Sequence, residues 1–80
     1  MRVTSLFFAS YRDLVGAEEI ELDLPEGSTV SELVDKVRSR PGAGAIPEAP
    51  VVAVNREYAS ADTVLSDGDE VAFIPPVAGG

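Results

Sequence analysis

The order of predicted elements places this chain in the α+β class, with one main helix packed on one face of a mixed β-sheet. Strand-like patterns occur before and after a single amphipathic helical segment, and no segment is repeated. Strands grouped on both sides of one helix are typical of this class. The 80 residues are enough for one small domain with a thin core.

The first part of the chain predicts two strands. Residues 3–9 are rich in β-branched and aromatic side chains, which favour a strand. Residues 11–15, followed by Gly16, predict a short helical turn that ends at the glycine. Residues 19–24 alternate polar and apolar side chains, as in a strand with one face in water. Residues 25–28 predict a turn.

The main helix is predicted to follow this turn. Thr29 and Glu32 have the spacing of a capping box. Four apolar residues then follow at positions i, i+3, i+4 and i+7 and form one stripe: Val30, Leu33, Val34 and Val37. Glu32 and Lys36 are spaced for an i,i+4 ion pair. Pro41 ends the helix.

The second half predicts a loop and short strands. Residues 41–49 are rich in Pro, Gly and Ala and carry little apolar surface, which predicts a mobile loop. Residues 51–54 and 71–74 predict strands, with turns at residues 55–57 and 66–69.

This order of elements fits the β-grasp arrangement of ubiquitin, in which the first and last strands lie side by side in the centre of the sheet. The fit is an analogy at the level of the fold and does not by itself give a function. We therefore predict a β-grasp domain over residues 1–74 and a flexible tail over residues 75–80.

One helix covers only one face of a sheet, yet the first and last strands carry large apolar residues on both faces. If Phe7, Val71 and Phe73 pack under the helix, other large apolar residues must point outward. These outward residues form a predicted docking surface beside the tail: Phe8, Tyr58 and Ile74. The alternative is that loops cover them as a minor second core.

The composition excludes several functions. A net charge of −8 repels nucleic-acid phosphates and anionic lipids and suits a basic protein partner. There is no cysteine and no histidine, so the chain has neither a thiol nucleophile nor the usual general base. Asp67, Asp69 and Glu70 lack the spacing of a calcium loop and are predicted to be turn residues. No signal peptide or membrane span is recognisable, which predicts a cytoplasmic protein.

The last six residues carry no charged side chain: Pro75, Pro76, Val77, Ala78, Gly79 and Gly80. The prolines favour extended backbone, and six extended residues span roughly 20 Å, enough to enter a cleft in another protein. The Gly80 carboxylate needs activation before it reacts, most simply as an acyl-adenylate. Sulfur or an amine would then displace the nucleotide. The alternative is a frayed terminus without a role.

Four segments resemble the small-subunit family of molybdopterin synthase. They read LFFA at residues 6–9, RDLVG at residues 12–16, DGDEVAF at residues 67–73 and PPVAGG at residues 75–80. The resemblance covers nearly the whole chain and is weakest at residues 41–49. It supports the β-grasp fold, which this ubiquitin-like family shares.

The resemblance implies a non-catalytic sulfur carrier in molybdenum cofactor biosynthesis. In this family the terminal glycine, here Gly80, is adenylated by an activating enzyme that uses ATP and is then converted to a thiocarboxylate. The carrier inserts its tail into the large, catalytic subunit of a heterotetramer. There it donates sulfur to a pyranopterin precursor, and the dithiolene of molybdopterin is formed. The family holds no permanent cofactor, and its contacts would fall on Phe8, Tyr58 and Ile74.

Other functions remain open at this stage. The sulfur carrier of thiamine thiazole synthesis shares the fold and the Gly-Gly end but lacks the LFFA start and the Pro-Pro-Val approach. A carrier for another thiolation pathway, a protein modifier, or an interaction domain with an unreactive terminus would also fit. Extending the chain by one alanine beyond Gly80 would inactivate a carrier and leave an interaction domain unaffected.

Overall fold

The computed structural model describes residues 1–76 of the chain. Its elements, in chain order, are β1 (Arg2–Phe7), α1 (Ala9–Val15), β2 (Glu19–Asp23), α2 (Val30–Arg38), the 3₁₀ turn η1 (Ala43–Ala45), β3 (Val51–Val54), β4 (Glu57–Ala59) and β5 (Glu70–Ile74).

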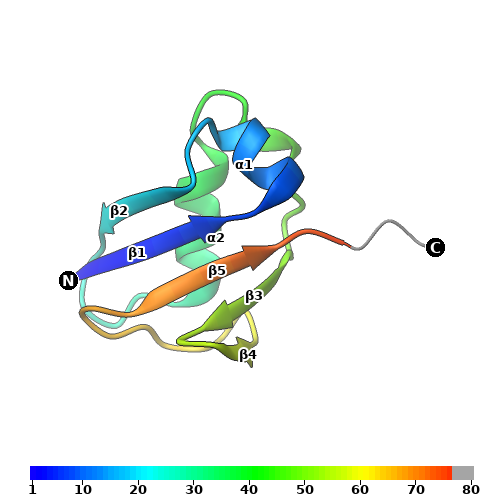
Figure 1. Ribbon diagram of the computed structural model, residues 1–80. Helices are drawn as coiled ribbons and strands as arrows, with labels where there is room; N and C mark the ends of the chain where they lie inside the picture. The colour runs from blue at the N-terminus through cyan, green and yellow to red at the C-terminus, as the bar shows by residue number, and fades with distance from the viewer. Residues whose placement is uncertain (77–80) are drawn as a thin grey trace.

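The five strands form one mixed sheet in the order β2-β1-β5-β3-β4. The central strands β1 and β5 are parallel, and the other three neighbouring pairs are antiparallel. Helix α2 crosses one face of the sheet, and α1 lies at the end where β1 and β5 finish (Figure 1). The predicted β-grasp fold, with its first and last strands paired at the centre, is confirmed.

The core lies between α2 and the inner face of the sheet. The whole apolar stripe predicted for the helix is buried. Facing it, the Phe7 and Phe73 rings lie opposite each other in the β1–β5 register, with their centroids 5.0 Å apart. Val71 is also fully buried. The predicted placement of these three residues under the helix is confirmed.

The predicted capping box at the start of α2 is present. The Thr29 side chain accepts a hydrogen bond from the Glu32 backbone, and the Glu32 carboxylate accepts one from the Thr29 backbone N–H at 3.2 Å. The predicted Glu32–Lys36 ion pair is wrong. Within residues 1–76, Lys36 Nζ instead donates to the backbone oxygen of Asp23 at 2.8 Å, because the Glu32 carboxylate is held at the cap.

The segment at residues 41–49 was predicted to carry little apolar surface, and this prediction is wrong. Ala43 and Ile46 are fully buried and extend the core beyond the end of α2. Arg38 Nε donates to the Ile46 carbonyl at 2.6 Å. Gly42 adopts a left-handed conformation against the Leu14 carbonyl, where a Cβ atom would lie only 2.7 Å from that oxygen.

Candidate docking face and tail root

The face of the sheet opposite α2 carries a continuous group of apolar side chains. The strand register places Leu6 beside Ala72, Ala72 beside Ala53, and Ala53 beside Tyr58. Val51 and Ile74 form the next row toward the end where the tail leaves. We call this group, together with Phe8, the outer apolar face: Leu6, Phe8, Val51, Ala53, Tyr58, Ala72 and Ile74.

Phe8 belongs to this face because the backbone is still extended at that position. Its φ and ψ of −116° and 151° turn its side chain to the side opposite that of Phe7. The Phe8 ring is half exposed. Phe8 also precedes the first turn of α1 without capping it through a side-chain hydrogen bond.

The structure brings the three predicted contact residues onto one face. Tyr58 is 79% exposed and Phe8 is half exposed, while Ile74 is partly buried. Phe8 and Tyr58 are therefore not covered as a second core, whereas Ile74 lies beside the loop residue Pro50 in an apolar hollow. Their role in binding a partner stays a prediction.

Sequence reasoning missed Val51, which is 54% exposed on the same face. Its neighbour Ala53 was missed as well. Strand alternation could have identified both, because Val52 points inward and the residues on either side of it must point outward.

The tail begins at the edge of the outer apolar face. Strand β5 ends at Ile74, and Pro75 is partly buried. These residues join Tyr11 of α1 and Pro50 in lining an apolar hollow of about 370 Å³. A partner that covers the face would therefore also meet the first residues of the tail.

Four residues of the predicted tail lie outside the described part of the chain: Val77, Ala78, Gly79 and Gly80. The predicted reactive group at Gly80, and the predicted flexibility of residues 75–80, therefore stay predictions. Pro76, the last described residue, is exposed.

Acidic side chains border the outer apolar face along β2 and at the start of β5. Glu19 lies beside Leu6, and Glu21 and Glu70 follow on the same face. The Arg2 guanidinium lies 3.5 Å from the Glu21 carboxylate and 3.3 Å from the Asp23 carboxylate. The hydrogen bond that Arg2 Nε donates to the Asp23 carboxylate, followed by the negative charges of Asp23 and Glu21, raises the pKa of Arg2. This distribution suits a partner with basic groups around an apolar patch.

Asp67 and Asp69 lie at the turn around Gly68, as predicted, but the prediction is wrong for Glu70, which is the first residue of β5. An Asp67 carboxylate oxygen accepts from the Arg2 backbone N–H at 2.7 Å. The Asp69 carboxylate accepts from the Asn55 side chain at 2.9 Å and from the Ser66 backbone at 2.7 Å. In residues 1–76, no three metal-ligating side chains are grouped to hold an ion.

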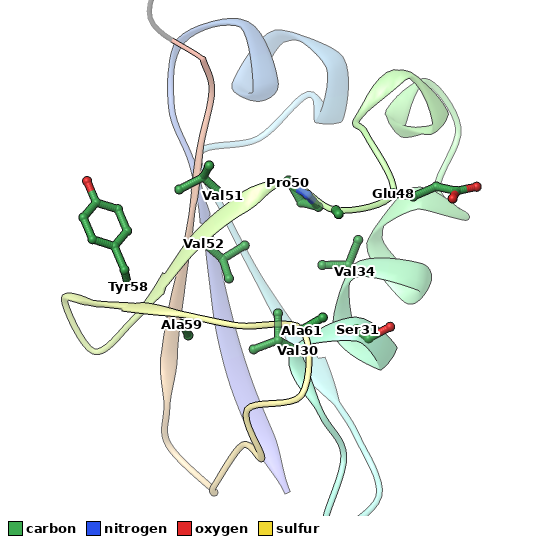
Figure 2. A pocket seen from close by; sticks show the side chains of 11 residues that line it. Val30, Ser31, Val34, Glu48, Pro50, Val51, Val52, Tyr58, Ala59 and Ala61 are labelled. Carbon is green, nitrogen blue, oxygen red and sulfur yellow. The ribbon is translucent and has the colours of Figure 1, made fainter.

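A second apolar hollow, of about 430 Å³, opens on the helix side of the sheet. It lies between α2 and the strands β3 and β4, with Val34 and Val52 on facing walls (Figure 2). The Tyr58 ring points away from it, toward the outer face (Figure 2). The hollow offers mainly apolar contact, and Val51 and Tyr58 of the outer apolar face contribute to its rim.

Comparisons with known proteins agree with this arrangement. The model of the ThiS family matches residues 5–80. The molybdopterin synthase sulfur carrier subunit of Drosophila erecta is 40% identical, over all of this chain and 92% of the relative. The corresponding subunit of Escherichia coli (strain K12) is also 40% identical, over 94% of this chain and 95% of the relative.

Two solved structures extend the similarity to three dimensions. A putative molybdopterin converting factor, subunit 1, from Pyrococcus furiosus has a TM-score of 0.82 and 36% identity, over 95% of this chain and 98% of that one. A chain in the complex of subunits 1 and 2 of the molybdopterin-converting factor from Helicobacter pylori 26695 has a TM-score of 0.74 and 25% identity, over all of both chains. Separately, no helix in residues 1–76 is long and apolar enough to cross a membrane.

Proposed function

Because this chain belongs to the ThiS family, we propose that it is the sulfur carrier subunit of molybdopterin synthase. The observation that carries the proposal is the continuity between the outer apolar face and the root of a tail that ends in Gly79 and Gly80. The face supplies a docking surface, and the tail supplies a terminal carboxylate free of side-chain bulk. The similarity to sulfur carrier subunits extends over both parts.

The partner on the outer apolar face is the large subunit of the synthase. The Helicobacter pylori chain with the same fold is solved in complex with subunit 2 of its own converting factor, which supports a partner of this kind. The exposed side chains of Phe8, Val51 and Tyr58 give this face large groups that a partner can bury. The acids Glu19 and Glu70 at its border favour basic groups on the partner.

The chain supplies the substrate group of the chemistry and no catalytic side chain. A Gly80 carboxylate oxygen attacks the α-phosphorus of ATP on an activating enzyme, and pyrophosphate leaves. A sulfur nucleophile then attacks the carbonyl carbon of the acyl-adenylate. The C–O bond to the phosphate breaks and AMP leaves, so that a thiocarboxylate remains. ATP thus serves the activating enzyme and is not a cofactor of this chain, and the reaction belongs in the cytoplasm.

The carrier then presents its sulfur to the pyranopterin precursor in the large subunit. Six extended residues from Pro75 reach roughly 20 Å from the domain, so the sulfur can enter a site that the folded domain cannot. The transfer contributes sulfur to the dithiolene of molybdopterin. In this scheme the domain positions the tail, and the large subunit supplies the catalytic groups.

The intact mass of the protein tests the proposal directly. The protein is incubated with an activating enzyme from the same organism, ATP and sulfide. We expect a mass change equal to one oxygen replaced by sulfur, located at Gly80 by fragmentation. The control is the chain extended by one alanine after Gly80, which should keep its original mass. An unchanged mass of the native chain, with an enzyme shown to be active on another carrier, would refute the carrier function.

A second step assigns the pathway. The thiocarboxylated protein is mixed with the large subunit and the pyranopterin precursor, and dithiolene formation is followed. Sulfur that reaches Gly80 but is not passed on by the large subunit would indicate a carrier for a different thiolation pathway.

A further inference from the structure

An activated carrier must keep its acyl group away from its own nucleophiles, and this chain has very few of them. Lys36 is the only lysine in the 80 residues, and there is no cysteine or histidine. The second primary amine of the sequence is the amino group of Met1. We propose that this carrier is built to pass its acyl group outward only, with both amines held where its own activated Gly80 cannot reach them.

Both amines are hydrogen-bonded to neighbouring backbone carbonyls. Lys36 Nζ donates to the oxygen of Asp23 at 2.8 Å. The Met1 ammonium donates to the oxygen of Leu24, also at 2.8 Å, and lies 3.9 Å from Glu26. Each hydrogen bond holds its nitrogen beside a backbone carbonyl of residues 23–24.

These carbonyls lie at the end of the sheet opposite the tail. Asp23 pairs with Arg2, at the beginning of β1, whereas Phe73 pairs with Phe7 at the end of β1. Because β1 and β5 are parallel, β5 ends on the side of the sheet opposite the N-terminus (Figure 1). The Asp23 carbonyl that binds Lys36 Nζ lies at the N-terminal side as well. Six residues along a strand separate the two ends by about 20 Å.

The tail is too short to return to that end of the sheet. The path from Ile74 to Asp23 also crosses from β5 over β1 to β2, about 10 Å sideways, so the two points are about 22 Å apart in a straight line through the domain. Strand β5 runs away from Asp23, so the tail would have to reverse its direction and pass around the folded domain, a longer path than the roughly 20 Å that its six residues span when fully extended. While Lys36 stays on the Asp23 carbonyl, its nitrogen lies beyond the reach of Gly80 in the same molecule.

The reaction avoided in this way is self-acylation. An amine nitrogen would form a C–N bond to the Gly80 carbonyl carbon, the C–O bond to the phosphate would break, AMP would leave, and the nitrogen would lose a proton to solvent. The product would be a cyclic chain, or two chains joined through Lys36. Its Gly80 carboxylate would no longer be available for sulfur transfer. The inference rests on the proposed function, because it concerns the activated form of Gly80.

A chemically installed thioester at Gly80 tests the inference without any activating enzyme. A failure of the proposed activation in the mass experiment is thereby kept separate from a failure here. Three full-length proteins are compared: the native chain, Ser10→Lys and Ser31→Lys. Ser10 is exposed in the first turn of α1, at the tail end, and Ser31 is exposed in the first turn of α2, at the far end. Each variant adds one exposed lysine in the same helical position.

The thioesters are incubated at mildly alkaline pH and low concentration, and the products are separated by intact mass. We expect the native chain and Ser31→Lys to hydrolyse to the free acid. Ser10→Lys should give a cyclic product, one water lighter than the acid, at least about tenfold more than the other two, because its amine and thioester meet within one molecule. Cyclic or oligomeric native protein joined at Lys36, or Ser10→Lys that does not cyclise, would overturn the inference.

Discussion

Replacing Tyr58 with alanine separates docking from folding more cleanly than any other change on the outer apolar face. Tyr58 is 79% exposed, so the folded domain depends on only about a fifth of its surface. A tyrosine side chain offers about 200 Å², which leaves about 160 Å² for a partner to bury. At about 25 cal/mol per Å², full burial would contribute about 4 kcal/mol to association.

This figure is an upper limit, because ordering and desolvation oppose association. We expect Tyr58→Ala to weaken binding to the large subunit by at least about 1.4 kcal/mol, which is tenfold in Kd. Its free energy of unfolding should fall by about 1 kcal/mol or less, because only about 40 Å² of buried surface is removed. Titration calorimetry with the large subunit and urea unfolding measure the two quantities.

Val64→Ala is the matched control for Tyr58→Ala. Val64 is 60% exposed, but it bridges to Thr29 beside the start of α2 and lies off the outer apolar face. We expect its Kd to match that of the native chain. Equal Kd values for the two variants, or a loss of unfolding free energy in Tyr58→Ala as large as its loss of binding free energy, would refute the assignment of the docking face.

Three further changes test the tail, the core and the loop. Adding one alanine after Gly80 should abolish thiocarboxylate formation in the mass assay while Kd changes less than tenfold (about 1.4 kcal/mol); any thiocarboxylate on the extended chain would contradict a terminal-carboxylate carrier. Ser5→Ala should raise the free energy of unfolding, measured in urea, by about 1 kcal/mol, because the buried Ser5 hydroxyl has no hydrogen-bond partner among the described residues. A lower free energy of unfolding would show that the hydroxyl does have a hydrogen-bond partner. Gly42→Ala should have a free energy of unfolding about 1–3 kcal/mol lower than that of Gly16→Ala. Both glycines have φ near +82°, but only at Gly42 would the new Cβ meet a backbone oxygen. Equal free energies of unfolding for the two variants would show that the Leu14 carbonyl moves aside without an energetic cost.

The fold and the outward residues could be predicted because short-range patterns determine them. The helix stripe, the capping box of Thr29 and Glu32, and the strand alternation each depend on residues a few positions apart. The apolar excess in the first and last strands also pointed to an uncovered face, on which Phe8 and Tyr58 now lie exposed.

The errors fall where distant segments compete for the same groups. Ile46 stands among prolines, glycines and alanines without periodicity, so only the assembled fold shows that it is buried. Lys36 is correctly spaced for Glu32, but the carboxylate is held at the helix cap and the Asp23 carbonyl lies within reach. Strand β4 has only three residues, which are too few to show the alternation of polar and apolar side chains that would predict a strand.

The parallel pairing of β1 and β5 explains how a thin domain serves as a carrier. Parallel neighbours end at the same edge of the sheet, so Phe8, which follows β1, lies at the same end as Pro75, which follows β5. The pairing thereby brings together a predicted docking residue and the root of the tail, which are almost 70 positions apart in the sequence. The same pairing sends the beginning of β1, and the carbonyls that hold Lys36 and Met1, to the opposite end. One topological feature therefore places the root of the tail beside the predicted docking residue Phe8 and at the end of the sheet opposite Lys36 and Met1.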